Sequence, residues 1–550
     1  MFIQSIIEFL GHIISNFTRS VAENYDLVEN SNIIVGMSGY NALEETGKEW
    51  WYSQPSDDEC NFQEYRNAEA TSRDYQPRQS PCVELENAAS TEDSREEREG
   101  LCETNEMAWK RLRPSITTSM RNSLYFGFLI SVASASVVGV ASFTVYYFSY
   151  QTQLICEMHS REKIPIELQW VITLSKIIAV GFLYVWFFLI IIFYFRPFQL
   201  SGVKRILVLL SVLFFLLDSV YRIAMQVCGV SHSKLTVLER IPPEVIFCLS
   251  SCSQIYIMKR HFCTGSLTKQ VKFVLLFIAP SALTLSIAIL VAYSIYPAYN
   301  KQDASGKLLI AVFSPLIVFI LKGVCRICIQ RLWCQISHPG TSFVLLSPMY
   351  CGSAIMLRLL QADLQSLESI ALTGAIHGIA EVIDRTMMAV IDHICHQAFE
   401  HRRISWGGFR TRRRERLATD ISIMSMLYES SAVITVNTFL HLYQYFYTYD
   451  NSPLKLLQSF AVTTSVPLGI EWMFTSVSIF IETRYKNLPV MAVWRNRWKR
   501  HLAVAFINAV MVSIWTTSSL LIAVEGRFKD SVKDHCDMPF NLCEFLKTCG

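Results

Sequence analysis

Long apolar stretches separated by short polar segments dominate the chain from about residue 124 onward. Because a bilayer core of about 30 Å takes about 20 helical residues to cross, such stretches predict membrane-spanning helices. The eleven candidates are 124–149, 170–195, 206–229, 244–258, 273–297, 308–328, 341–357, 366–395, 420–445, 456–482 and 501–524. The predicted fold class is all-α, a polytopic transmembrane bundle of about eleven spans within residues 107–524. The two shortest candidates are 244–258, which is short for a helix that crosses the bilayer core, and 341–357, which is barely long enough.

Residues 1–106 have a different pattern, with 22 Asp and Glu against 7 Lys and Arg. Their few apolar residues cannot offset the entropy of ordering, so we expect an acidic and mostly disordered tail. Two exceptions stand out. Residues 1–14 repeat apolar side chains at helical spacing, which is typical of an amphipathic helix at a membrane surface. The apolar island at 32–45 is a candidate docking motif for a protein partner, or has no function.

Composition agrees with a membrane protein. The 550 residues are 51% apolar and 17% charged, whereas a soluble domain has about 25% charged residues. These values exclude collagen-like, coiled-coil, disulfide-scaffold and wholly disordered classes. Most bases lie beside the apolar spans, so the expected partners are the lipid bilayer and anionic lipid at basic cytosolic loops, and not nucleic acid.

The distribution of bases also predicts the orientation. If the N-terminus is cytosolic, the inner connections carry 26 Lys and Arg and the outer segments 12, as expected for cytosolic loops. The N-terminus is therefore predicted to be cytosolic and the C-terminal tail, 525–550, extracytosolic. The alternative that 366–395 lies on the membrane surface would place thirteen bases of two later loops outside, so crossing is the better interpretation. The sequence does not identify which cellular membrane contains the protein.

Cysteine chemistry follows from this topology. Four cysteines fall on the oxidising side and are disulfide candidates in three possible pairings: Cys156, Cys536, Cys543 and Cys549. A zinc site with His535 is the alternative. At the inner boundary, Cys325 and two neighbouring cysteines are candidates for S-palmitoylation or for plain packing.

Ionisable residues within predicted spans are the candidate functional residues, because each costs about 2.5–3.5 kcal/mol to insert. One face of the span 366–395 carries most of them, namely His377, Glu381, Asp384, Asp392 and, at its edge, Arg385. We call this face the polar stripe. Glu381 and Arg385 are spaced to pair on the helix, which leaves His377 and Asp384 to titrate as a proton relay or cation site. A fully satisfied structural network is the alternative.

A second candidate element is the span 456–482, where Glu471 follows Pro467 and Gly469. Proline and glycine together mark a place where a membrane helix can break and expose backbone groups to ions or substrate. We therefore expect the polar stripe to face Glu471 and this break. The segment 347–353 has the same character, whereas Asp218 and Arg222 are expected to form a structural pair.

Enzyme motifs are missing from the sequence, which has no H-E-x-x-H, P-loop or G-x-S-x-G pattern. A single H-x-x-H box at 393–396 is too little for a di-iron site, so no enzyme, metal or cofactor is expected. The predicted function is transport of a small solute or ion through an ionisable mid-membrane site, with proton coupling as an option. The alternative is a non-transporting sensor or scaffold whose acidic tail binds partners. Transport predicts a water-accessible cavity lined by the polar stripe, and a scaffold predicts a stripe buried in side-chain pairs.

Overall fold

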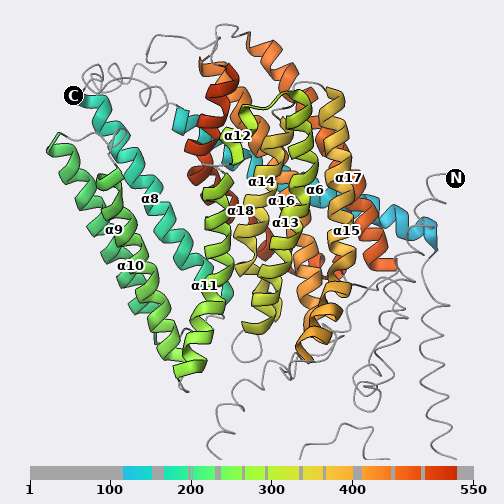
Figure 1. The fold of residues 1–550 in the computed structure, drawn as a ribbon, viewed down its shortest axis with the longest axis horizontal. Coiled ribbons are helices and arrows are strands. Elements are labelled where there is room, and N and C mark those ends of the chain that lie inside the picture. Colours follow the sequence, from blue (N-terminus) through green and yellow to red (C-terminus); the bar gives the residue numbers. More distant parts are fainter. Residues whose placement is uncertain are drawn as a thin grey trace, which may run out of the picture. The chain divides into compact units, whose positions relative to one another are not determined.

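The computed structural model describes the chain as helices and their connections, with no strand among the described residues (Figure 1). The described residues are 115–150, 166–195, 200, 202–229, 237–262, 267–291, 295–332, 339–362, 364, 367–400, 412–447, 452–484, 488 and 490–528. The expected disordered tail at 1–106, the four disulfide candidates and residues 529–550 of the C-terminal tail lie outside this set.

Twelve α-helices and one 3-10 helix are described. In the first half of the chain they are α6 (Ile116–Ser149), α8 (Ile166–Tyr194), α9 (Lys204–Val227), α10 (Val237–Phe262), α11 (Leu267–Leu290) and the short α12 (Tyr296–Asn300). In the second half they are α13 (Ala304–Leu332), η5 (Pro339–Leu345), α14 (Ser347–Ala362), α15 (Leu367–Glu400), α16 (Arg412–Tyr447), α17 (Pro453–Arg484) and α18 (Val490–Phe528).

Each of the eleven predicted spans overlaps at least one α-helix, which confirms the all-α class for the described part of the chain. Seven of these helices are long and apolar enough to cross a bilayer, namely α6, α8, α9, α10, α11, α13 and α17. The chain is therefore a multi-pass membrane protein. Helix α14 has only 16 residues, and α15, α16 and α18 are not among these seven candidates. The crossing of these four helices stays a prediction.

Two predicted spans differ from the observed helices. The stretch 273–297 is helical only to Leu290, and α12 begins at Tyr296. The stretch 341–357 is divided between η5 and α14, because Pro348 has no backbone N–H and is accommodated in the first turn of a new helix. The expected interruption at 347–353 is therefore the start of α14.

The expected break in α17 is wrong, since this helix runs without interruption from Pro453 to Arg484. Pro467 cannot donate a hydrogen bond to the carbonyl oxygen of Thr463, one turn earlier. The side chain of Asn437 on α16 supplies the missing donor, with Nδ2 lying 3.2 Å from that oxygen. A side-chain amide from a neighbouring helix thus keeps the helix continuous.

The chain divides into two compact units. The larger one comprises Leu124–Ser478 and Arg497–Gly550, and the smaller one Met1–Ser123 and Ile479–Asn496. In the larger unit α14 packs against α16 and α13, and α13 packs against α15. Most side chains of α14 are buried, whereas α9 exposes large apolar side chains such as Leu209, as expected for a helix that contacts lipid. The predicted pair of Asp218 and Arg222 on α9 is confirmed at 2.7 Å.

In the smaller unit, the end of α17 leads into α18 through a tight connection. The backbone N–H of Leu488 donates to the carbonyl of Glu482, and that of Val490 donates to the carbonyl of Leu488.

Candidate functional site

Arg358, on α14, is the centre of a buried group of charged side chains in the larger unit. Its Nη2 atom lies 2.5 Å from Oε2 of Glu471 on α17 and 3.3 Å from Oε2 of Glu429 on α16. All three side chains are almost fully buried, at 3% exposure or less. One guanidinium therefore neutralises carboxylates from two other helices and ties the three helices together.

Gln361, one turn after Arg358, connects the end of α14 to α15. Its Oε1 atom accepts a hydrogen bond of 2.8 Å from Nη1 of Arg358, and its Nε2 atom donates to the backbone carbonyl of Ile370 at 2.7 Å. The guanidinium is thus oriented by a side chain that is itself held by the first turn of α15.

Three members of the polar stripe on α15 are paired side chains. Nε2 of His377 lies 2.8 Å from Oε2 of Glu429, the same oxygen that faces Arg358. One turn later Glu381 forms an ion pair with Arg385 and also accepts a hydrogen bond of 2.7 Å from the hydroxyl of Ser425. The predicted pairing of Glu381 with Arg385 is therefore present.

Asp384 lies at the end of the group next to α13. Its Oδ2 atom is 4.0 Å from Nζ of Lys322, and it interacts electrostatically with Arg326. Arg326 also donates to the backbone carbonyl of Met388 at 3.3 Å. The charged group therefore extends over five helices, from α13 to α17. We call it the ion network, and its members are Lys322, Arg326, Arg358, His377, Glu381, Asp384, Arg385, Glu429 and Glu471.

The ion network is balanced in charge when its four acids and four bases are all ionised and His377 is neutral. Buried charges are tolerated only where a partner offsets their lost hydration. Removal of a charged member whose partner has no second partner would leave an uncompensated charge, at a cost of about 3–5 kcal/mol for a buried pair. His377 is the member whose side chain can be either neutral or positively charged while it keeps a hydrogen bond to a carboxylate.

Close approach of α15 to its neighbours depends on two glycines one turn apart. A Cβ atom at Gly374 would lie 2.8 Å from Nε2 of Gln361, and one at Gly378 would collide with the ring of Phe474 on α17. Gly378 therefore needs the smallest residue, and a larger residue at Gly374 would displace the amide of Gln361. This close packing lets His377, between the two glycines in sequence, reach the carboxylate of Glu429.

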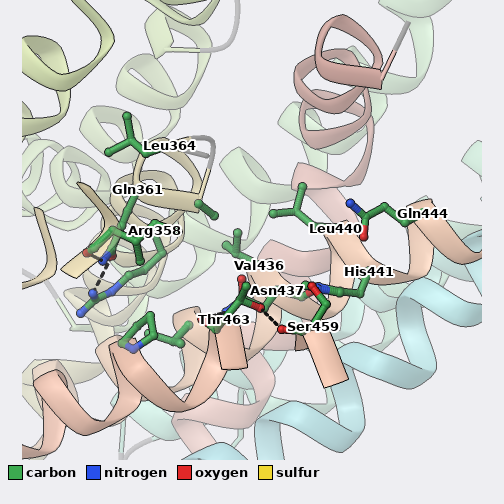
Figure 2. A pocket seen from close by; sticks show the side chains of 14 residues that line it. Arg358, Gln361, Leu364, Val436, Asn437, Leu440, His441, Gln444, Ser459 and Thr463 are labelled. Carbon is green, nitrogen blue, oxygen red and sulfur yellow. Dashed lines mark hydrogen bonds between the residues drawn. The ribbon is translucent and has the colours of Figure 1, made fainter. Parts of the chain in front are cut away.

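A cavity of about 200 Å³ reaches the ion network between α14, α16 and α17 (Figure 2). Arg358 and Gln361 lie at one end, and His441, Gln444 and the exposed Ser459 lie at the other (Figure 2). Asn437, Thr463 and Pro467 line the space between them, so the same side-chain amide that keeps α17 continuous also borders the cavity. Among the described lining residues, Arg358 is the one with a permanent formal charge.

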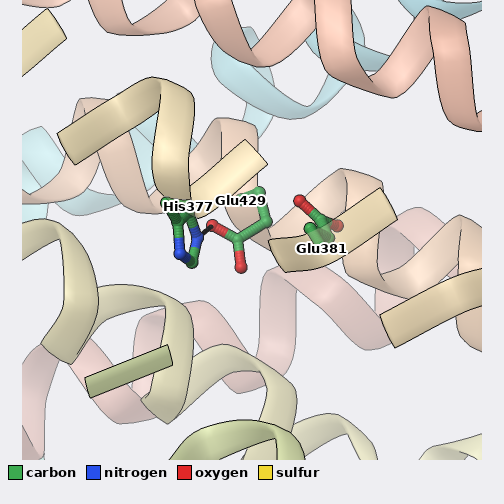
Figure 3. Close-up of side chains that lie close together, drawn as sticks. All are labelled: His377, Glu381 and Glu429. Carbon is green, nitrogen blue, oxygen red and sulfur yellow. Dashed lines mark hydrogen bonds and ion pairs between the residues drawn. The ribbon is translucent and has the colours of Figure 1, made fainter. Parts of the chain in front are cut away.

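His377, Glu381 and Glu429 also form a group that could hold a metal ion, because their ligand atoms all lie within 4.8 Å of one another. Figure 3 shows the carboxylate of Glu429 between the other two side chains. Each carboxylate, however, is already bound by an arginine. A divalent ion would compete with these guanidinium groups for the same oxygens and would add charge to a balanced group. The arrangement therefore favours hydrogen-bond and proton chemistry over metal binding.

The structure brings together five of the six predicted binding residues, namely His377, Glu381, Asp384, Arg385 and Glu471, whereas the side chain of Asp392 lies outside the described part. Their function stays a prediction, as these contacts also fit a structural network. Arg358 was missed because it follows the predicted span 341–357 by one residue, where a base is expected to contact the membrane surface. Its signal was the continuing apolar pattern of 359–360.

The chain matches no protein-family model, and neither a characterised protein nor a solved structure is significantly similar to it. Its function is therefore argued from the geometry of this site.

Proposed function

We propose that the protein carries a small solute or ion across its membrane, with the cavity as one access route to the ion network. The observation that supports this most is that the cavity ends on Arg358, whose guanidinium joins two other helices. A volume of about 200 Å³ accommodates about six water molecules at ~30 Å³ each. Because pockets for drug-sized ligands are about 300–1,000 Å³, a substrate here is smaller than such ligands.

The ion network contains contacts between helices that can rearrange during transport. Transport needs two arrangements of the helices whose populations the substrate shifts. Arg358 already divides its donors between Glu429 and Glu471, so a substrate that displaces one carboxylate alters the contacts of α14 with α16 or α17. His377 shares Glu429 with Arg358, which links this displacement to a titratable group and supports proton coupling.

The mouth of the cavity lies near the end of the predicted span 420–445 and the start of 456–482. With a cytosolic N-terminus, this end of both helices is extracytosolic. The cavity then opens to the extracytosolic side, and the ion network lies between it and the cytosol.

A non-transporting sensor or scaffold is the second candidate, and one observation favours it. The described members of the polar stripe, His377, Glu381, Asp384 and Arg385, are held in side-chain pairs and do not line the cavity. In this alternative the ion network fixes the packing of α13 to α17, and the acidic tail binds a partner.

The two candidates separate in vesicles that contain the purified full-length protein. Phosphatidylcholine vesicles are loaded with glycerol, methanesulfonate or tetramethylammonium, and loss of the trapped solute is followed with the membrane potential held near zero. We expect at least one solute to leave faster than from protein-free vesicles. Thr463→Trp, which fills the cavity, should abolish the difference, whereas the matched control Leu209→Trp, on the exposed surface of α9, should not. Equal retention of all three solutes would overturn transport.

A further inference from the structure

The cavity and the ion network together have a charge pattern that selects among substrates. The lining offers the guanidinium of Arg358 at one end and the amides of Gln361, Asn437 and Gln444 along it. The carboxylates of Glu429 and Glu471 contact Arg358 but do not line the cavity. A solute entering from the mouth therefore reaches the guanidinium of Arg358 before it reaches either carboxylate. The planar guanidinium suits carboxylate, phosphate or sulfonate groups.

Charge balance shows what must accompany such an anion. The ion network is neutral with His377 uncharged, so an added anion leaves one net negative charge in a buried site, which is unfavourable. One proton taken up at the same time restores neutrality.

One ring nitrogen of His377 can accept that proton. Because an ionised carboxylate only accepts hydrogen bonds, the contact with Glu429 keeps a proton on Nε2 of His377 in both charge states. Its other ring nitrogen, Nδ1, is buried and has no hydrogen-bond partner among the described residues. Nδ1 is therefore the atom at which this side chain gains or loses a proton.

Charged groups from its own helix and from four others surround His377. Glu429 from α16 contacts it directly, Glu381 precedes Arg385 on its own helix, and Glu471 from α17 lies beyond Arg358. The nearby bases are Arg358 from α14, Arg385 and, from α13, Lys322. If Arg358 shifts its donors to an anion, Glu429 loses a cationic partner, and a protonated His377 replaces it.

We propose that the cavity binds an oxyanion through Arg358 and that His377 takes up one proton with it. This inference rests on the proposed transport function and names its substrate class. By reciprocity, a lower pH then raises the affinity for the anion by the same factor by which the anion favours protonation. The oxyanion can be a free solute or the head of an anionic lipid, since a guanidinium recognises both in the same way.

Proton uptake on binding tests the proposal directly. Full-length protein in phosphatidylcholine nanodiscs is titrated at neutral pH, in weak buffer with a pH dye, with sodium methanesulfonate, an anion that does not itself titrate. We expect uptake approaching one proton per protein, and none with sodium chloride, tetramethylammonium chloride or glycerol. His377→Gln should abolish uptake, and the control His261→Gln, on α10, should retain it. Methanesulfonate binding without proton uptake in the unaltered protein, or uptake with tetramethylammonium instead, would overturn the proposal.

Charge-changing variants at the mouth of the cavity test anion binding without altering the buried ion network. Ser459 is exposed, so Ser459→Glu and Ser459→Lys leave the buried contacts of Arg358 intact. We expect Glu to weaken and Lys to strengthen methanesulfonate binding by about fivefold, the scale of one charge acting in a partly hydrated site, with Ser459→Gln as the neutral control. The opposite order of the two variants would contradict an anion site.

Two further experiments are needed. One distinguishes a lipid head from a free solute as the source of the anion, and the other distinguishes a failure of transport from a failure of anion binding. Nanodiscs that contain phosphatidylglycerol should lose methanesulfonate-dependent proton uptake if a lipid head fills the site, and should keep it if the ligand is a free solute; both results support an oxyanion site. In the vesicle assay, loss of glycerol or tetramethylammonium alone would uphold transport and overturn the oxyanion. Proton-linked binding of methanesulfonate with full retention of every solute would overturn transport and uphold the site.

Discussion

Nη2 of Arg358 lies 2.5 Å from Oε2 of Glu471, although the two residues are 113 positions apart in the chain. Their helices, α14 and α17, are joined at this point by a charge-assisted hydrogen bond, which is shorter and stronger than a neutral one. Because Glu429 from α16 contacts the same nitrogen, Arg358 is the residue on which the packing of three helices depends most.

Removal of Arg358 should therefore destabilise the protein more than removal of either partner. Arg358→Met leaves two buried carboxylates with reduced neutralisation, and we expect a loss of about 3–5 kcal/mol in the free energy of unfolding. Glu471→Gln leaves Arg358 paired with Glu429 and should cost less. Unfolding in mixed micelles measures both effects. In a double-mutant cycle, Arg358→Met with Glu471→Gln should be less destabilising than the sum of the two single changes, and strict additivity would show that the pair is not coupled.

The contact of Asn437 with α17 leads to a second prediction. Asn437→Leu removes the donor to the carbonyl of Thr463 and should cost about 0.5–1.5 kcal/mol, the net value of a hydrogen bond at this part-buried position. Pro467→Ala restores a backbone N–H at the position that normally bonds this carbonyl. We therefore expect Asn437→Leu to be much less harmful in the Pro467→Ala background. An equal loss in both backgrounds, measured by unfolding in micelles, would contradict this role of Asn437.

The sequence could predict the helices and part of the site, for a physical reason. Apolar stretches of membrane length and helical spacing are local properties, and so is the cost of an ionisable residue within such a stretch. The polar stripe with His377, Glu381 and Arg385 follows from that cost. The pairing of Glu381 with Arg385 could also be predicted, because it depends on spacing within one helix.

The rest of the site depends on contacts between helices that are distant in the sequence. Arg358 lies at the end of an apolar stretch, where a base normally orients a span, and only the packing of α14 buries it. Pro467 and Gly469 indicate a break when α17 is considered alone, yet Asn437 of α16 prevents it. The cavity is likewise formed by side chains of α14, α16 and α17 and has no local signature.

Topology gives a third prediction, which tests whether α15 crosses the membrane and whether the chain has eleven spans. If α15 crosses the membrane, the connection after it is cytosolic together with the N-terminus. We expect a tag at residue 60 and a tag between Gly407 and Gly408 to be cytosolic, and a tag after Gly550 to be extracytosolic. Protease protection and antibody accessibility in sealed cells measure this. An accessible tag at 407–408 would place α15 on the membrane surface, and residue 60 and Gly550 on the same side would contradict the eleven spans.

The role of Glu381 is the last prediction, because its contacts allow a structural and a transport role to be separated. Glu381 is held by Arg385 on its own helix and by Ser425 on α16. Glu381→Gln keeps the size of the side chain and removes its charge, which leaves the buried Arg385 without its acid. We expect surface abundance to fall while the flux per molecule stays normal, since Glu381 does not line the cavity.

The double variant Glu381→Gln with Arg385→Gln removes both charges together and should recover part of the lost abundance, because no uncompensated cation remains. The matched comparison is the pair Asp218→Asn and Arg222→Gln on α9, another i,i+4 ion pair, which does not contact the cavity. Abundance and flux are measured on the same cells. Normal abundance with lost flux in Glu381→Gln would instead assign Glu381 to the transport path and would require the solute to pass the cavity and reach α15.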